Sequence, residues 1–264
     1  MQSPSPPAPR TMRIALHYRG VPIATLTQPM IESLQAVPDT GLRFAYDEAS
    51  EWVDLATDTL NKSLEILHSI LLAAQLAPSP GVEHVDVLHP LTQERLGRVD
   101  RHLARLLGME MHSAHMLVVS DRGLCLQRRS LSKTVDPGLW DTTVGGTRVA
   151  GESIDQTLVR EMWEEAGLST EQLTDVRLLG MWSFDRESTY GIYPAWQQEK
   201  IWVWAARVAQ AHWEPRCSDG EVMEFAWQPF CVLQSNAAVP LTHELRVLLD
   251  GPELTQYLAR MDSL

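Results

Sequence analysis

Four glutamates and Arg160 stand at fixed spacings between residues 146 and 168, and this segment is the part of the chain best suited to chemistry. If the segment is helical, Glu161, Glu164 and Glu165 share one sector, because each residue turns a helix by about 100°. Like charges in one sector repel each other unless a cation joins them. Clustered carboxylate oxygens suit Mg²⁺ or Mn²⁺, which also bridge substrate phosphates. The spacing therefore predicts metal-assisted chemistry on a phosphorylated substrate.

The neighbouring residues predict the helix that would carry these groups, over residues 154–166. Ser153 followed by Gln156 has the form of a capping box, and Gly167 suits the position just beyond the helix end. Apolar residues at four-residue spacing form the stripe that docks the helix: Ile154, Leu158 and Met162. Arg160 precedes Glu164 by four residues, so it can orient a carboxylate or offset its charge.

The segment from Gly146 to Leu168 resembles the signature of the Nudix superfamily, and every fixed position of that signature is filled. The resemblance implies an α/β fold, an α/β/α sandwich with a mixed sheet. It also implies hydrolysis of a nucleoside diphosphate, or of another diphosphate, linked to a further moiety. The implied metal ligands are Glu161, Glu164, Glu165 and the Gly146 carbonyl, with Glu152 and Arg160 supporting the loop and the helix.

An acidic E-x-x-E-E run in isolation is most often a solvated helix face. Here the glycines, Glu152 and Arg160 complete the pattern, so we favour the functional interpretation. In some Nudix members a glutamate outside the motif supplies the general base or another ligand. The candidates in this chain are Glu221 and Glu224 in the DGEVMEF segment, and the sequence does not choose between them. The candidate catalytic set is therefore Glu161, Glu164, Glu165 and Arg160, with Glu221 as the further member.

Concentrated positive charge lies upstream of the motif, at Arg128, Arg129 and Lys133. Such cations can hold a diphosphate, whereas any single one could equally be a solvated residue at a strand end. The longer pattern R-S-x-x-K-x-x-x-P-G-x-W is similar to a Nudix branch that includes isopentenyl-diphosphate isomerases. In that branch the residues that match Arg129 and Lys133 contact the substrate diphosphate, which makes the three cations candidate substrate-binding residues.

Two alternative functions remain beside hydrolysis. The isomerase family has a catalytic cysteine where this chain has Gly145, and a histidine where it has Thr147. Cys125 lies earlier, in an expected strand, and does not replace that cysteine, so hydrolysis is favoured. The second alternative is a non-catalytic Nudix-like regulator that binds a nucleotide or metabolite. The complete glutamate set argues against it, because a binding module has no need of those groups.

A weaker resemblance concerns the substrate. Nudix proteins related to thiamin pyrophosphokinase carry an N-terminal extension of similar size and a D-G-E-V segment like Asp219 to Val222. This resemblance implies thiamin diphosphate, or a damaged analogue, as the substrate. No motif in the first hundred residues can be matched to that group position by position.

The composition excludes several partners. A formal charge of −12 and a pI near 5.2 argue against binding of a nucleic-acid polymer. Three scattered cysteines fit neither a disulfide framework nor a zinc site, so we expect a reducing, cytoplasmic location. The most apolar stretch, residues 60–77, carries polar and charged residues, which argues against a membrane span. The prolines of residues 1–11 predict a disordered tail and argue against a secretion signal. A homodimer is compatible with the resemblance.

The remaining pattern predicts a small α+β domain over residues 12–108 and the Nudix domain over 109–264. In the first, we expect two strands joined by a turn at Arg19-Gly20, followed by helical segments at 30–37, 57–76 and 91–107. The second has expected strands at 115–119, 124–129, 176–182, 200–208 and 221–228. Its expected helices are 154–166 and 242–261, the latter interrupted at Gly251-Pro252.

Overall fold

The structure is a computed structural model that describes residues 12–37, 44–47, 52–55, 59–209, 213–235 and 239–261. The expected tail, residues 1–11, lies outside the described residues. The chain divides into two compact units, of which one is formed by Met1–Glu110 with Asp185–Gln198 and the other by Met111–Phe184 with Glu199–Leu264. Residues 185–198, which the sequence assigned to the second domain, are thus grouped with the first unit. The cause is the length of strands β11 (Leu173–Tyr190) and β12 (Tyr193–Val208), which extend far beyond the expected segments.

The first unit begins with the predicted strand pair, β1 (Arg13–Tyr18) and β2 (Val21–Thr27). The turn at Arg19-Gly20 is confirmed, since both residues have positive φ angles, 52° and 79°. Two strands that the sequence did not predict, β3 (Phe44–Asp47) and β4 (Trp52–Leu55), complete a sheet in the order β2-β1-β4-β3. Helices α1 (Gln28–Gln35) and α2 (Leu60–Ala73) confirm two helical segments with slightly different ends.

The third helical segment of this unit was predicted wrongly in its first half. Residues 95–100 form strand β6 (Arg95–Asp100), which pairs with β5 (His84–Leu88), and only α3 (Arg101–Leu107) is helical. The side chain of Asp100 accepts hydrogen bonds from the backbone N–H groups of His102 and Leu103. Asp100 is therefore an N-cap, and an N-cap fixes where the helix begins.

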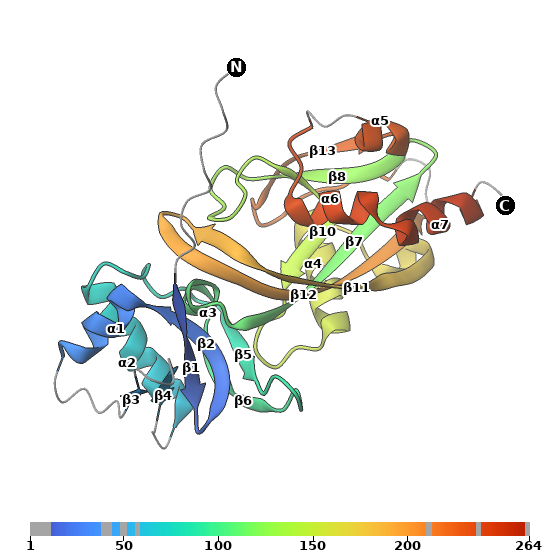
Figure 1. Ribbon diagram of the computed structural model, residues 1–264. Coiled ribbons are helices and arrows are strands. Elements are labelled where there is room, and N and C mark those ends of the chain that lie inside the picture. The colour runs from blue at the N-terminus through green and yellow to red at the C-terminus, as the bar shows by residue number, and fades with distance from the viewer. Residues whose placement is uncertain are drawn as a thin grey trace. The chain divides into compact units, whose positions relative to one another are not determined.

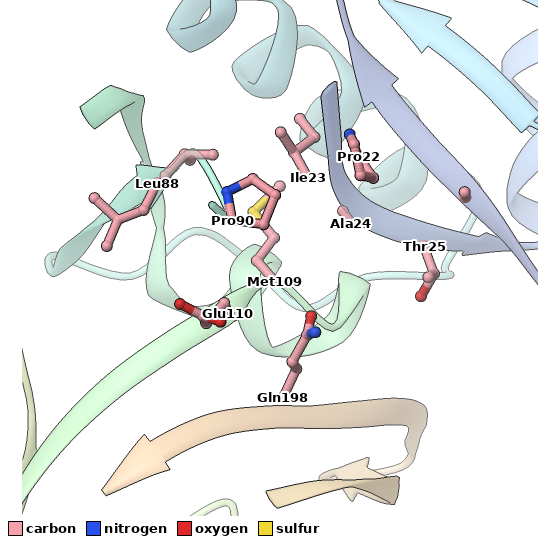
Figure 2. A pocket seen from close by; sticks show the side chains of 11 residues that line it. Pro22, Ile23, Ala24, Thr25, Leu88, Pro90, Met109, Glu110 and Gln198 are labelled. Carbon is pink, nitrogen blue, oxygen red and sulfur yellow. The ribbon is translucent and has the colours of Figure 1, made fainter. Parts of the chain in front are cut away.

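The first unit also contains a small pocket with a volume of about 210 Å³. Most of its lining is apolar and comes from β1, β2 and the segment around β5, including Ile23, Leu88 and Pro90. Figure 2 labels Glu110 and Gln198 among the polar residues that line this pocket. Every residue that lines the pocket belongs to the first unit.

The second unit is built on a seven-stranded sheet. Its main path runs in the order β11-β12-β7-β8-β13, with β10 paired to β7 and β9 paired to β8. The bounds are β7 (Glu110–Ser120), β8 (Gly123–Arg129), β9 (Trp140–Asp141), β10 (Val144–Thr147) and β13 (Val222–Gln228). Strands β9 and β10 were not predicted from the sequence, because they are two and four residues long and too short to show an alternating pattern.

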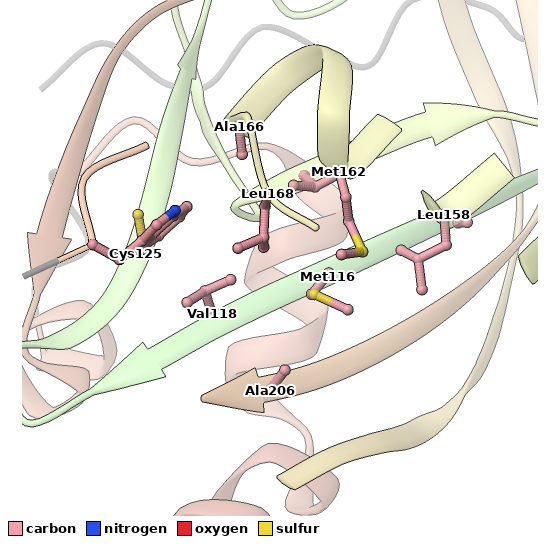
Figure 3. Close-up of a cluster of buried hydrophobic side chains, with 11 residues drawn as sticks. Met116, Val118, Cys125, Leu158, Met162, Ala166, Leu168 and Ala206 are labelled. Atoms are coloured by element: carbon pink, nitrogen blue, oxygen red, sulfur yellow. The ribbon is translucent and has the colours of Figure 1, made fainter. Parts of the chain in front are cut away.

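Helices cover both faces of this sheet (Figure 1), which confirms the predicted α/β/α arrangement. On one face, Met116 and Val118 of β7 pack against Leu158 and Met162 of α4 (Ile154–Ala166), as Figure 3 shows. On the other face, neighbouring β7 residues pack against α6 (His243–Asp250) and α7 (Pro252–Met261). The predicted helix break at Gly251-Pro252 is confirmed. Alternate residues of a strand point to opposite faces, so β7 is buried on both sides and holds α4 in place.

Short elements complete the unit: a 3₁₀ turn (Thr170–Gln172) and α5 (Phe230–Ser235). Across the described part of the chain, no helix combines the length and the apolar character that a membrane span requires.

Candidate active site

Helix α4 has the bounds and the caps that the sequence predicted. Ser153 accepts a hydrogen bond from the backbone N–H of Gln156, and the Gln156 side chain accepts one from the Ser153 N–H. Gly167 ends the helix in the left-handed conformation, with φ of 59°. The loop after β12 completes this end, because Arg216 and Ser218 donate backbone hydrogen bonds to the carbonyls of Ala166 and Glu164. The helix is therefore fixed at both ends.

The three clustered glutamates of α4 differ in burial. Glu161 and Glu165 are buried, whereas the side chain of Glu164 is 41% exposed. Glu165 Oε2 accepts two hydrogen bonds, from the Gly145 N–H at 2.8 Å and from Gln127 Nε2 at 3.0 Å. Two of the three carboxylates thus point into the molecule beside β10, and the third lies at its rim.

Burial makes the charged forms of Glu161 and Glu165, the inner pair, costly. It raises the pKa of Glu165, and the charge of Glu161 adds to that effect. Burial also raises the pKa of Glu161, although Arg160 opposes the shift. Two adjacent buried carboxylates are unfavourable as anions unless a cation joins them. Hard oxygen donors in this condition fit a divalent cation such as Mg²⁺ or Mn²⁺.

Gly146 allows the close approach of β10 and α4. A Cβ atom at position 146 would overlap the carboxylate of Glu161, so no side chain can be accommodated there. The Gly146 backbone therefore lies against one of the candidate metal ligands, next to the Gly145 amide that holds Glu165. A role of the Gly146 carbonyl as a further ligand stays a prediction.

Arg160 joins the loop before α4 to the carboxylates of the helix. Its guanidinium donates to both carboxylate oxygens of Glu152, to Glu161 at 2.6 Å and to Glu164 at 3.0 Å. Burial alone would raise the pKa of Glu152, but the bonds from Arg160 and Thr157 outweigh it and lower that pKa. Within the described ranges, no group of three acidic, histidine or cysteine side chains encloses a metal position. Arg160 compensates part of the negative charge of the carboxylates that it contacts.

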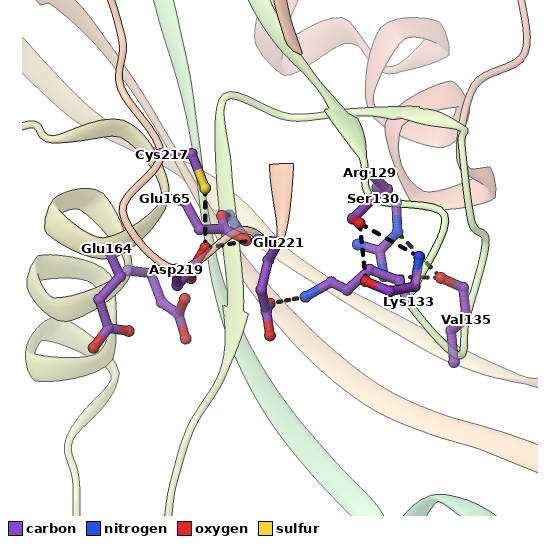
Figure 4. Close-up of polar contacts among 12 residues, drawn as sticks. Arg129, Ser130, Lys133, Val135, Glu164, Glu165, Cys217, Asp219 and Glu221 are labelled. Atoms are coloured by element: carbon purple, nitrogen blue, oxygen red, sulfur yellow. Dashed lines mark hydrogen bonds and ion pairs between the residues drawn. The ribbon is translucent and has the colours of Figure 1, made fainter. Parts of the chain in front are cut away.

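Lys133 connects the loop after β8 to the acidic centre (Figure 4). Its ammonium group forms an ion pair with Glu221, and its charge opposes the rise that burial causes in the pKa of Glu161 and Glu165. The backbone carbonyl of Glu221 accepts from the Ser130 N–H at 2.9 Å. The sequence left Glu221 and Glu224 open as the further glutamate. Glu221 is the one linked to the centre through Lys133, which favours it.

The two arginines have partners of their own in this loop. Arg129 is largely buried, donates to Asp141 at 3.2 Å and holds the carbonyl of Val135 with two bonds. Arg128 pairs with Glu224 at 2.8 Å, and both of these side chains are more than one third exposed. Arg129 thus fixes the loop of residues 130–138, whereas Arg128 lies nearer to solvent and holds only the end of this loop, through a bond from its Nε to the Gly138 carbonyl at 3.0 Å. Their predicted contacts with a substrate remain predictions.

Two residues of the site were missed by the sequence reasoning. Gln127 gave no signal, because its contact with Glu165 spans 38 residues of sequence. His115 lies beside Gly145. A Cβ atom added at position 145 would be only 2.7 Å from the imidazole carbon Cε1 of His115. His115 Nδ1 is 2.9 Å from the Thr142 hydroxyl, which donates in turn to the carbonyl of Val144. The imidazole therefore fills the space that a side chain at position 145 would need.

Known proteins resemble this chain over part of its length. A family model described as NUDIX domain matches residues 109–246. An isopentenyl-diphosphate Delta-isomerase of Salmonella typhi is 31% identical over 161 residues, which are 60% of this chain and 84% of that protein. An uncharacterized Nudix hydrolase of Pseudomonas aeruginosa is 40% identical over 74 residues, 28% of this chain and 44% of that protein. A crystal structure of a Deinococcus radiodurans protein shares the fold, with a TM-score of 0.50 and 20% identity over 64% of this chain and 98% of that one.

Proposed function

The chain belongs to the NUDIX domain family, and we propose that it hydrolyses a diphosphate linkage in a small organic or nucleoside diphosphate substrate with Mg²⁺ or Mn²⁺ as cofactor. The family and the similar Nudix hydrolase support a pyrophosphohydrolase. The observation that carries the proposal is the buried pair Glu161 and Glu165, held by Arg160 and by the Gly145 amide. Such a pair needs a cation to be stable as anions at neutral pH.

The cation would be held by Glu161, Glu164, Glu165 and the carbonyl of Gly146. When bound, a divalent cation neutralises phosphate charge and lowers the pKa of a bound water. Arg160 and Glu152 keep the loop and the helix at a fixed separation through their two hydrogen bonds.

Lys133 and Glu221 are the pair that we expect to respond to the substrate. Lys133 is bound to Glu221 in the structure. A phosphate would compete for the ammonium group, because charge-assisted bonds to phosphate are strong. Glu221 would then be released to accept a proton from the attacking water. Arg129 and Arg128 are further candidates for contact with the phosphates.

Isomerase chemistry is the competing activity, given the similarity to isopentenyl-diphosphate isomerases. Two observations oppose it. Position 145 is a glycine where those enzymes carry the catalytic cysteine, and His115 fills the adjacent space. The complete set of motif glutamates also favours hydrolysis. A regulator that binds without turnover is the remaining alternative.

The organic moiety is proposed on weaker grounds. The Asp219 to Val222 segment and the size of the N-terminal extension resemble those of Nudix proteins related to thiamin pyrophosphokinase, which favours thiamin diphosphate or a damaged analogue. We expect a small-molecule partner, a cytoplasmic location, and no binding of a nucleic-acid polymer.

The test is a substrate panel with the full-length chain. Thiamin diphosphate analogues, dinucleotides, nucleoside triphosphates and isopentenyl diphosphate are incubated in D₂O with Mg²⁺, with Mn²⁺ or with a chelator. Cleavage that requires the cation supports the proposal. Deuterium incorporation into isopentenyl diphosphate without cleavage identifies an isomerase, and binding without turnover identifies a regulator; either result overturns hydrolysis.

A further inference from the structure

Gln127 lies in β8 beside the acidic centre and is 1% exposed. Its carboxamide Nε2 donates to Glu165 Oε2 at 3.0 Å. Its carboxamide oxygen, Oε1, is buried and has no hydrogen-bond partner among the described residues. A buried acceptor without a partner costs about 1–3 kcal/mol, so natural proteins rarely keep one without a role.

Packing alone does not account for a glutamine at this position. Cys125, which lies two residues earlier on the same face of β8, is apolar and completely buried in the core that packs against α4. A leucine at position 127 would fill a similar volume and would leave no acceptor unsatisfied. The glutamine therefore has to be explained by its polar atoms.

Its two polar ends suit different partners. The Gly145 N–H and Gln127 Nε2 both donate to Oε2 of Glu165, which fixes the rotation of that carboxylate. Oε1 of Glu165 is then the oxygen left to face a cation. Magnesium retains several of its waters when proteins bind it, and those waters donate hydrogen bonds to nearby acceptors.

We propose that Gln127 is a positioning residue of the cation site, with Nε2 orienting Glu165 and Oε1 accepting a hydrogen bond from the hydration shell of the bound cation. The inference rests on the proposed function for the presence of the cation. It adds a residue outside the motif and accounts for the unsatisfied oxygen. Outer partners of this kind typically change metal affinity or activity by about 10–100-fold.

The experiment measures Mn²⁺ binding to the full chain by electron paramagnetic resonance, without substrate. Gln127→Leu removes both polar ends, and we expect its Kd for Mn²⁺ to rise by about 10–100-fold. Gln127→Glu keeps acceptor oxygens, loses the donor and adds a negative charge that also favours the cation, so it should bind Mn²⁺ at least about 10-fold more tightly than Gln127→Leu. Gln228→Leu, on the neighbouring strand β13, is the matched control and should bind like the unchanged chain.

Circular dichroism melting confirms that each variant is folded. A structural role for Gln127 would lower the melting temperature without changing the Mn²⁺ Kd, and that result overturns the inference. Equal Kd values for Gln127→Leu and Gln127→Glu would overturn the acceptor role of Oε1. If Mn²⁺ binding depends on Gln127 but no substrate of the panel is cleaved, the proposed hydrolysis fails while the positioning role stands.

Discussion

The two sides of the candidate site are built differently. On the helix side, Arg160 binds Glu152, Glu161 and Glu164, so a single guanidinium holds three carboxylates. On the loop side, each cation has a separate acidic partner: Arg128 with Glu224, Arg129 with Asp141 and Lys133 with Glu221. The helix side is one network, whereas the loop side is a set of independent pairs.

The difference indicates which side can change when a substrate binds. Breaking one bond of the Arg160 network would leave buried carboxylates without compensation, which is costly. A cation on the loop side can instead exchange its acidic partner for a phosphate. The helix side should therefore determine the affinity for the cation, and the loop side should determine the binding of the substrate. Lys133 belongs to the loop side but also acts on the pKa of Glu161 and Glu165.

The largest effect is expected from Glu165→Gln and Glu164→Gln on the helix side. A neutral amide cannot replace an anionic ligand, so each variant should lose at least about 100-fold in kcat, with the greater loss at the buried Glu165. Steady-state rates with saturating Mg²⁺ measure the loss, and circular dichroism verifies folding. Full metal-dependent turnover in both variants would refute the assignment of the helix side.

Lys133→Ala tests whether the loop side sets substrate binding. Removing one cation that stabilises phosphate charge should lower kcat/KM by about 100-fold. The affinity for Mn²⁺ without substrate should change much less than in Glu165→Gln. Lys133→Arg, which keeps the charge, serves as the control and should recover part of the activity. A loss of Mn²⁺ binding as large as that of Glu165→Gln would contradict the division between the two sides.

The helix side was predictable because its signals are local. The capping box at Ser153, the C-terminal glycine and the apolar stripe all lie within 15 residues of sequence, and the structure confirms each of them. Helical angles also predicted that the three glutamates share a sector. They could not predict that Glu165 is buried while Glu164 is partly exposed, because this depends on the position of the sheet.

The loop side and its neighbours depend on contacts between distant segments. The Lys133 pair with Glu221 spans 88 residues, and the bond from Gln127 to Glu165 spans 38. No periodicity in the sequence reports such contacts. The same limit applies to the first unit, where β4 pairs in parallel with β1 across the intervening β2, α1 and β3. Only Asp100, as an N-cap, could have located the start of α3.

The carboxylates of the helix side should make the free energy of unfolding fall as the pH rises, and a bound cation should raise it again. Burial raises the pKa of Glu165 from 4.5 to about 8, so in that range the folded protein holds a proton that the unfolded chain has released. Without divalent cations, stability should therefore fall as the pH rises from 4.5 towards 8. Mg²⁺ at 100 times its Kd should add about 2.7 kcal/mol at the upper end.

Urea unfolding at several pH values, with and without Mg²⁺, measures both effects. Glu165→Gln is the control, and both the fall with pH and the gain from Mg²⁺ should be much smaller in this variant. A chain whose stability rises with pH over the same range, without cations, would show that the inner pair is not the dominant titrating group.

The smallest effects are expected from the arginines of the loop side, and they differ from each other. Arg129→Ala should lower the free energy of unfolding by about 1–3 kcal/mol, because it removes the cation that pairs with the buried Asp141 and the donor to the carbonyl of Val135. Arg128→Ala should cost about 0–1 kcal/mol, since its pair with Glu224 is exposed. Urea unfolding of both variants measures the two costs. Equal costs would mean that Arg129 does not fix the loop, and its guanidinium would then be as ready as that of Arg128 to exchange its partner for a phosphate.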